Sequence, residues 1–188
     1  MPLAHKHKES LVIVYTGEGK GKTSAGLGLV CRALGNGSRV AFIQFIKSWH
    51  VSEDRFLETV LPAFGDSLTM HKGGRGFYNA GRLSAKNVSP GEHRKSARQT
   101  YEFAAACGSS GSYDVVICDE INNAVHDGLL SVHDLRTLID SRHKRTTLCL
   151  TGRNFPMLLS NSVDIMTNMT KIKHHFDDGY EANKGIDY

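Results

Sequence analysis

Hydrophobic residues along this chain of 188 residues gather in short runs that alternate with longer amphipathic segments. The runs rich in Val, Ile, Leu and Phe predict strands at residues 11–17, 39–45, 67–72, 114–120, 146–152 and 164–176, of which 67–72 is the weakest. The intervening segments predict helices at 22–37, 53–61, 92–107, 132–142 and 156–162. Nearly continuous apolar strands indicate burial on both faces. We therefore expect an α/β fold with a doubly wound, mostly parallel sheet.

One connection stands out because it has neither the helical nor the strand period. Residues 73–91, "GGRGFYNAGRLSAKNVSPG", are rich in glycine, serine and asparagine. Connections of this length are uncommon in compact domains and are often functional loops. No internal repeat or low-complexity linker interrupts the chain, so we expect a single domain over residues 1–188, with residues 1–10 flexible.

Composition narrows the class of protein. The formal net charge of +4 is too small to indicate a nucleic-acid partner. The start, "MPLAHKHKES", lacks the apolar stretch of a signal peptide, and no apolar run reaches the roughly 20 residues of a membrane span. The four cysteines have no C-x-x-C spacing, which favours reduced thiols: Cys31, Cys107, Cys118 and Cys149. We expect a cytoplasmic protein with neither a membrane nor a nucleic-acid partner.

The stretch "TGEGKGKT", residues 16–23, matches the phosphate-binding P-loop pattern G-x-x-x-x-G-K-[ST] except at its first position, which is Thr16. It follows a predicted strand and opens a predicted helix, which is the context the motif requires. Its glycines allow successive N–H groups to converge on an anion. Lys20 adds positive charge or is simply solvated, and Glu18 is expected to point outward. The residues predicted to bind a nucleoside triphosphate are Gly17, Glu18, Gly19, Lys20, Gly21, Lys22 and Thr23.

Two acidic residues, Asp119 and Glu120, follow the apolar run "VVIC" of a predicted buried strand. Asp119 is expected to bind Mg²⁺ (or Mn²⁺) together with the Thr23 hydroxyl. Glu120 is predicted to organise the same metal or to position a water for hydrolysis of the γ-phosphate. At this point the residues indicate ATP and a divalent metal, and an ordinary ATPase remains open.

Six stretches in order along the chain resemble the P-loop family of ATP:corrinoid adenosyltransferases. They are "TGEGKGKTSAGLG", "RVAFIQFIKS", "GRGF", "YDVVICDEINNAV", "LTGRN" and "KHHFDDGYEANKGIDY". A threonine opening the P-loop is usual in that family. The resemblance implies that a Co(I) corrinoid attacks the ribose C5′ carbon of ATP and that triphosphate leaves. Lys22 would then stabilise the departing triphosphate, Ser24 would add a hydroxyl, and Glu120 would act on the metal.

Further site residues are expected where strands end, because ligands of open α/β sheets bind at the carboxyl edge. Gln44 lies at the end of one predicted strand and Lys47 just after it, and Arg153 follows another strand. Gln44 and Lys47 are therefore expected to bind the cofactor at this edge, and Arg153 is expected to reach the nucleotide or the corrin rim. Surface positions are the alternative for Lys47 and Arg153.

The resemblance places the corrin at the connection 73–91, where the family carries Gly-Phe-x-Trp. Here the run is "GFYN": Phe77 is expected to press on the lower face of the corrin, and Asn79 stands in the place of the tryptophan. Tyr78 and Trp49 are the aromatic candidates to replace it. The terminal "HHFDDGYEANKGIDY" is expected to be ordered over the nucleotide, and His174 and His175 are not expected to bind a metal.

The resemblance also implies partners. They are a corrinoid (cobalamin, cobinamide or cobyrinic acid diamide), a reduced flavin or flavoprotein as electron donor, and a second copy of the chain in a homodimer. Two other functions remain open: a RecA-like P-loop ATPase, and a catalytically impaired relative that binds a nucleotide or a corrinoid.

Overall fold

A computed structural model describes residues 6–47, 51–76, 78 and 88–187. Its centre is a six-stranded sheet in the order β3-β2-β4-β5-β1-β6, in which every neighbouring pair is parallel. The strands are β1 (Val12–Thr16), β2 (Val40–Gln44), β3 (Leu68–Lys72), β4 (Val115–Asp119), β5 (Thr147–Thr151) and β6 (Ile165–Asn168). The predicted α/β class with a parallel sheet is confirmed.

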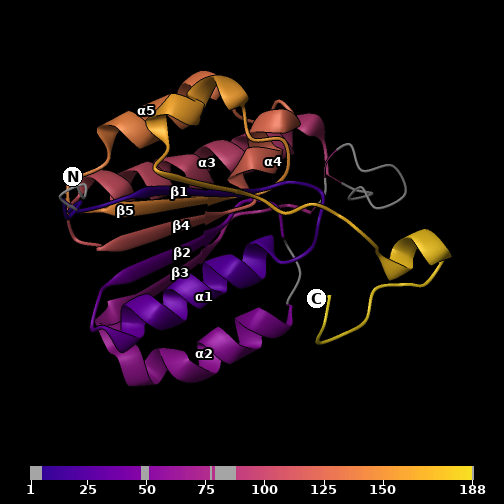
Figure 1. The fold of residues 1–188 in the computed structure, drawn as a ribbon, viewed down its shortest axis with the longest axis horizontal. Coiled ribbons are helices and arrows are strands. Elements are labelled where there is room, and N and C mark those ends of the chain that lie inside the picture. The colour runs from indigo at the N-terminus through magenta and orange to yellow at the C-terminus, as the bar shows by residue number, and fades with distance from the viewer. Residues whose placement is uncertain (1–5, 48–50, 77, 79–87, 188) are drawn as a thin grey trace, which may run out of the picture.

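Helices cover both faces of this sheet (Figure 1). On one side lie α1 (Lys22–Gly35) and α2 (Ser52–Phe64), and on the other lie α3 (Pro90–Ser109), α4 (Ile121–His126) and α5 (Val132–Ser141). Short 3-10 helices occur at η1 (Gly65–Ser67), η3 (Met157–Ser162) and η4 (His175–Asp178). None of the helices among the described residues has both the length and the apolar character needed to span a membrane.

The strand residues alternate between two hydrophobic clusters, as the two-residue period of a strand requires. Val12 and Val14 of β1 pack with α3 and α5, whereas Ile13 between them packs with α1 and α2. The same alternation puts Ala41 in the first cluster and Phe42 in the second. Burial on both faces explains why these strands are apolar at nearly every position.

Local signals fix where α3 and α5 begin. The Ser131 hydroxyl accepts a hydrogen bond from the Asp134 N–H at 3.1 Å, and the Asp134 carboxylate accepts one from the Ser131 N–H at 2.8 Å. Ser89 and Glu92 form the same reciprocal cap at α3. Arg98 of α3 binds the Asp134 carboxylate at 2.8 and 3.0 Å, which holds the pKa of Asp134 far below its usual range and joins the two helices.

The structure corrects three predicted elements and adds one that was not predicted. The predicted strand 164–176 is wrong after Asn168, because the chain leaves the sheet there and Met169 contacts the P-loop instead. The predicted helix 156–162 is a 3-10 helix, and the helix predicted to end at residue 61 continues past Pro62 to Phe64. Helix α4 was not predicted, because six residues directly after a strand give too short a pattern.

Candidate functional site

The P-loop connects β1 to α1 at the carboxyl edge of the sheet, as predicted. Gly17 and Gly21 have φ of +100° and +108°, a left-handed conformation that suits glycine. Gly19 is required for a different reason: a Cβ there would lie 2.7 Å from the Met169 carbonyl oxygen. The Gly19 N–H donates to that carbonyl at 2.6 Å. The residues that follow β6 therefore form one wall of the loop.

Lys22 reaches back across the loop that precedes it. Its Nζ donates to the carbonyls of Gly17 at 2.6 Å and Gly19 at 2.7 Å. Burial lowers the pKa of Lys22, and the nearby Arg153 lowers it further. The ammonium is thus held at the centre of the loop, where a P-loop lysine meets phosphate.

Asp119, at the end of β4, is fully buried and collects polar groups from several strands. Its Oδ1 accepts a hydrogen bond from the Thr151 hydroxyl at 2.7 Å. Its Oδ2 lies 3.3 Å from the Thr23 hydroxyl, 3.4 Å from Gln44 Nε2 and 3.9 Å from Lys47 Nζ. The contacts of Oδ2 are long for hydrogen bonds, so this oxygen is the weakly held one and faces the P-loop.

Glu120 has a strained backbone and a buried carboxyl group. Its φ of +63° is left-handed, which costs about 1–3 kcal/mol in a residue other than glycine and is typical of functional sites. Its N–H donates to the Thr151 hydroxyl at 2.9 Å. Burial, reinforced by the Asp119 carboxylate, raises the pKa of Glu120 to about 7. Its Oε2 is buried and has no hydrogen-bond partner among the described residues.

These donors suit a hard divalent cation. Thr23, Asp119 and Glu120 offer only oxygen atoms, which Mg²⁺ prefers. Two observations point to a missing positive charge: the long contacts of Asp119 Oδ2 and the unpartnered Oε2 of Glu120. The residues present therefore fit the predicted Mg²⁺ site.

Lys47 is held close to this cluster and is not a surface lysine. Its Nζ binds Glu53 at 2.7 Å, and both side chains are mostly buried, at 13% and 15% exposure. Burial alone would lower the pKa of Lys47, but Asp119 and Glu53 hold it above its usual value. Glu53 was not predicted as a site residue, because acidic residues such as Glu53 and Asp54 are common in the first turn of a helix and do not by themselves indicate a site.

Arg153 and Glu18 meet at the rim of the P-loop. The Arg153 guanidinium lies 3.2 Å from the Glu18 carboxylate, and both side chains are about half exposed, at 55% and 56%. The Arg153 N–H donates to Asn123 Oδ1 at 2.8 Å, which fixes the turn after β5 against α4. Glu18 points outward as expected, and Arg153 lies beside the loop.

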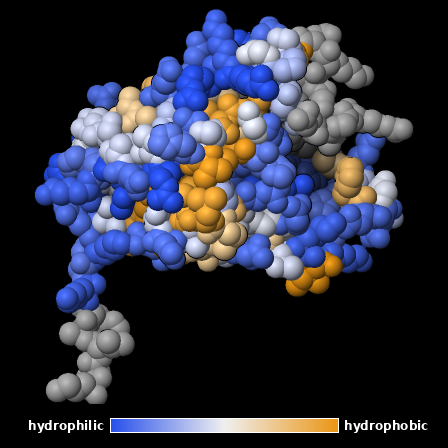
Figure 2. Space-filling model, turned by 90° about the horizontal axis from the view of Figure 1, so that it is seen from above, coloured by the Kyte–Doolittle hydropathy of each residue, from blue (hydrophilic) through white to orange (hydrophobic). Residues whose placement is uncertain are grey.

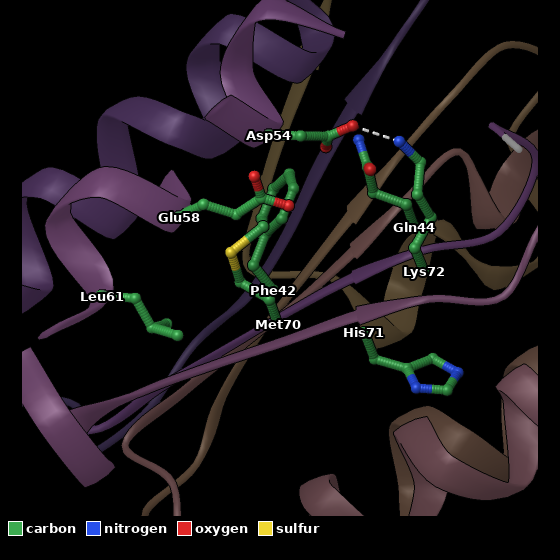
Figure 3. Close-up of a pocket in the computed structure, with 8 residues that line it drawn as sticks. All are labelled: Phe42, Gln44, Asp54, Glu58, Leu61, Met70, His71 and Lys72. Carbon is green, nitrogen blue, oxygen red and sulfur yellow. Dashed lines mark hydrogen bonds and ion pairs between the residues drawn. The ribbon is translucent and has the colours of Figure 1, made fainter. Parts of the chain in front are cut away.

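Two cavities border these residues. One, of about 400 Å³, lies between the P-loop and the end of the chain and is lined by Lys20, Gly21, Ser24, Lys173, His174, His175, Ile186 and Asp187. The other, of about 310 Å³, lies between α2 and the strands β2 and β3 (Figure 3) and is lined by Phe42, Gln44, Asp54, Glu58, Leu61, Met70, His71 and Lys72. Figure 3 shows Asp54 paired with Lys72 beside Gln44. Gln44 therefore separates this second cavity from Asp119.

A comparison with protein families matches residues 8–188 to the family described as ATP:corrinoid adenosyltransferase BtuR/CobO/CobP. The chain belongs to this family. A corrinoid adenosyltransferase of Sinorhizobium sp is 32% identical over 182 residues, which cover 96% of this chain and 81% of that protein. The corrinoid adenosyltransferase of Escherichia coli (strain K12) is 29% identical over 182 residues, 96% of this chain and 87% of that one.

The solved structure of the flagellar accessory protein FlaH from Methanocaldococcus jannaschii is similar in fold. Its TM-score is 0.51 at 16% identity, over 86% of this chain and 71% of that one. At this identity the likeness shows the P-loop fold alone. The family name, by contrast, implies a transferase with ATP and a corrinoid as substrates.

The start of the predicted corrin loop lies at the same edge of the sheet as the adenosyltransferase P-loop. The Gly76 N–H donates to the Ile46 carbonyl at 2.9 Å, and a Cβ on Gly74 would lie 2.1 Å from Ile46 backbone atoms. The Tyr78 ring lies 5.1 Å from that of His93 on α3. Phe77, Asn79 and Trp49 lie outside the described residues, so the predictions for them are not tested.

The structure brings together most of the predicted site and adds two residues to it, Glu53 and Thr151. Thr23, Gln44, Lys47, Asp119 and Glu120 form one cluster beside Lys22, and Arg153 lies at the rim. Besides Glu53, sequence reasoning missed Thr151, whose hydroxyl contacts both Asp119 and the Glu120 N–H. Its position directly before Gly152 and Arg153, in the stretch "LTGRN", was the available signal.

Proposed function

We propose that this chain transfers the 5′-deoxyadenosyl group of ATP to the Co(I) centre of a corrinoid and releases triphosphate. Family membership supports the reaction class. The observation that carries the proposal is the meeting of three features at one sheet edge. These are the Lys22 ammonium within the P-loop, the buried Asp119–Glu120 pair, and the start of the connection that is expected to hold the corrin.

The step is a substitution at carbon. The electron pair of Co(I) forms the cobalt–carbon bond to C5′ while the C5′–O bond breaks, and the electrons of that bond leave with the triphosphate. Cobalt becomes Co(III) and the carbon is reduced, so no further oxidant is needed. Negative charge grows on the departing oxygen. Lys22 and the N–H groups of the loop are placed to stabilise that charge in the transition state.

Lys22 would transfer its hydrogen bonds from the Gly17 and Gly19 carbonyls to the triphosphate. Thr23, Asp119 and Glu120 would hold Mg²⁺ (or Mn²⁺), which when bound supplies positive charge for the polyphosphate. Gln44 and Lys47 would orient Asp119 through their contacts with its Oδ2. Ser24 and Lys20, on the other side of the loop, would contact the outer phosphates.

Several features of the proposal concern the corrinoid and the assembly. Phe77 would press on the lower face of a corrin, with cobalamin, cobinamide or cobyrinic acid diamide as the candidates. A reduced flavin or flavoprotein would supply the electron that generates Co(I). We also propose a cytoplasmic homodimer. Hydrophobic residues form a band on the side of the molecule that also carries α5 and η3 (Figure 2), and Met157 and Leu158 of η3 are exposed. These apolar residues support association of two copies.

The test is anaerobic incubation of the protein with MgATP and a chemically reduced Co(I) corrinoid. We expect a light-sensitive cobalt–carbon product and one equivalent of triphosphate. Lys22→Ala should abolish both products, whereas Lys144→Ala, an exposed lysine before β5, should retain both. ADP and orthophosphate without an adenosylated corrinoid would instead support a RecA-like ATPase. Tight binding of ATP or corrinoid without turnover would support a non-catalytic binding protein.

A further inference from the structure

The C-terminal segment, defined here as Lys173–Asp187, lies against the P-loop (Figure 1). In Figure 1 the yellow trace passes the carboxyl edge of the sheet and its end returns toward the start of α1. The cavity of about 400 Å³ lies between Lys20, Gly21 and Ser24 on one side and this segment on the other. The same cavity therefore borders both the phosphate loop and the end of the chain.

Asp187 is the acidic residue that the C-terminal segment contributes to this cavity, and several contacts hold its carboxylate. It forms an ion pair with Lys20, and the side chain of Asp187 is only 4% exposed. Its Oδ2 accepts the Asn183 N–H at 2.7 Å and lies 3.4 Å from His175 Nε2. The hydrogen bond from Lys20, followed by that from Asn183, lowers the pKa of Asp187. The carboxylate is thus ionised and fixed at the loop.

Four other residues that line the cavity carry groups able to bind an anion. Lys20 and Lys173 are cationic, and His174 and His175 are basic. His174, His175 and Asp187 have donor atoms within 4.8 Å of one another, which resembles a metal cluster. However, His174 Nδ1 already accepts the Phe176 N–H at 3.1 Å, and Asp187 is already bound to Lys20. An anion that replaces the carboxylate on Lys20 fits these contacts better than a metal does.

We propose that Asp187 is a positioning residue for Lys20. Its carboxylate pairs with the Lys20 ammonium at the place where a polyphosphate binds, so a polyphosphate ligand must displace Asp187 from Lys20. The expected ligands are the triphosphate chain of ATP and the triphosphate product, and this choice of ligand rests on the proposed function. A carboxylate beside an incoming polyanion is repelled, and it competes for the same ammonium group. The same contact, re-formed after turnover, favours release of triphosphate.

The test measures binding of inorganic tripolyphosphate with Mg²⁺ by calorimetry, in the absence of corrinoid. The Lys20 side chain of this ion pair is half exposed, at 51%, and ion pairs that water reaches are weak, so we expect Asp187→Asn to lower the Kd by about two- to fivefold. Asp187→Glu should restore the wild-type Kd. In a Lys20→Gln background, Asp187→Asn should give a smaller gain in affinity, because the ammonium for which the two anions compete is gone and only the direct repulsion remains. Added salt should reduce the gain, since it screens an ion pair whose lysine is half exposed.

Asp178→Asn is the matched control, because Asp178 is an exposed acid of the same segment that carries the same charge. It should leave the Kd unchanged, and thermal unfolding should show that all variants are folded. An unchanged or weaker affinity in Asp187→Asn would overturn the proposal. An equal gain in affinity from Asp187→Asn in the Lys20→Gln background would also overturn the proposal, because the effect would then come from net charge and not from competition for Lys20. Since no corrinoid is present, these outcomes are independent of whether adenosyl transfer occurs.

Discussion

At the scale of single residues, the site depends on how Thr151 arranges two neighbouring acids. Its hydroxyl donates to Asp119 Oδ1 and accepts from the Glu120 N–H. It thereby turns Asp119 Oδ2 toward Thr23 and fixes the left-handed backbone of Glu120. The sequence identified the two acids because they end an apolar strand. It could not identify Thr151 as their partner, because β5 lies beside β4 only in the folded sheet.

Replacing this hydroxyl tests its role. Thr151→Val keeps the shape of the side chain but leaves Asp119 without its short hydrogen bond. We expect affinity for Mg²⁺ and the turnover rate to fall by about 10- to 100-fold, as for other residues that orient metal ligands. Stability should fall by about 1–3 kcal/mol. Thr146→Val is the control: its hydroxyl donates to the Tyr113 carbonyl, so this variant should lose stability without losing Mg²⁺ affinity.

The raised pKa of Glu120 predicts a dependence of stability on pH in the metal-free protein. Because this pKa rises from 4.5 to about 7 on folding, the folded protein favours the neutral carboxyl group. The stabilisation is complete below pH 4.5, where Glu120 is protonated in both states, and it is lost as the pH rises through 7.

Denaturant unfolding in EDTA at pH of about 5 and about 8 measures this effect. Relative to Glu120→Gln, whose side chain does not ionise, the wild type should lose stability between the two values. If the difference in stability between the wild type and Glu120→Gln did not change with pH, the result would contradict a raised pKa for the buried Glu120 carboxyl group.

At the scale of elements, the P-loop is shaped by the chain that follows β6 as well as by its own sequence. The motif predicted a glycine-rich turn between a strand and a helix, and the structure confirms that arrangement. The contact of Gly19 with Met169 was not predicted. A strand was expected to continue over 164–176, whereas the chain leaves the sheet after Asn168. A non-local backbone contact of this kind leaves no periodic signal in either segment.

Two Gly→Ala substitutions distinguish the effect of this backbone contact on stability from the effect of helix propensity. Gly19→Ala puts a Cβ 2.7 Å from the Met169 carbonyl, so we expect lower stability and weaker MgATP binding. Gly28→Ala, inside α1 with nothing within 4 Å of the new Cβ, should raise stability by about 0.5–1 kcal/mol. Thermal unfolding and nucleotide titration report both effects. A harmless Gly19→Ala would mean that the loop and Met169 move apart easily.

At the scale of the whole molecule, the parallel order of the sheet assembles the site. The carboxyl ends of β1, β2, β4 and β5 bring together the P-loop, Gln44, Asp119 and Thr151. Apolar runs and the P-loop sufficed to predict the class, the five strands before residue 153 and the position of the P-loop at the carboxyl edge of the sheet. They did not supply the strand order, the helix α4 or the path of the C-terminal segment. Those features depend on contacts between residues far apart in the chain.

The central claim is that ATP is cleaved between carbon and oxygen rather than between phosphorus and oxygen. The direct measurement is the reaction with MgATP and Co(I) corrinoid in water enriched in oxygen-18, followed by mass spectrometry of the phosphates. Attack at C5′ predicts intact triphosphate without solvent oxygen, equal in amount to the adenosylated corrinoid. Orthophosphate that carries solvent oxygen, together with ADP, would show attack at phosphorus and contradict the account.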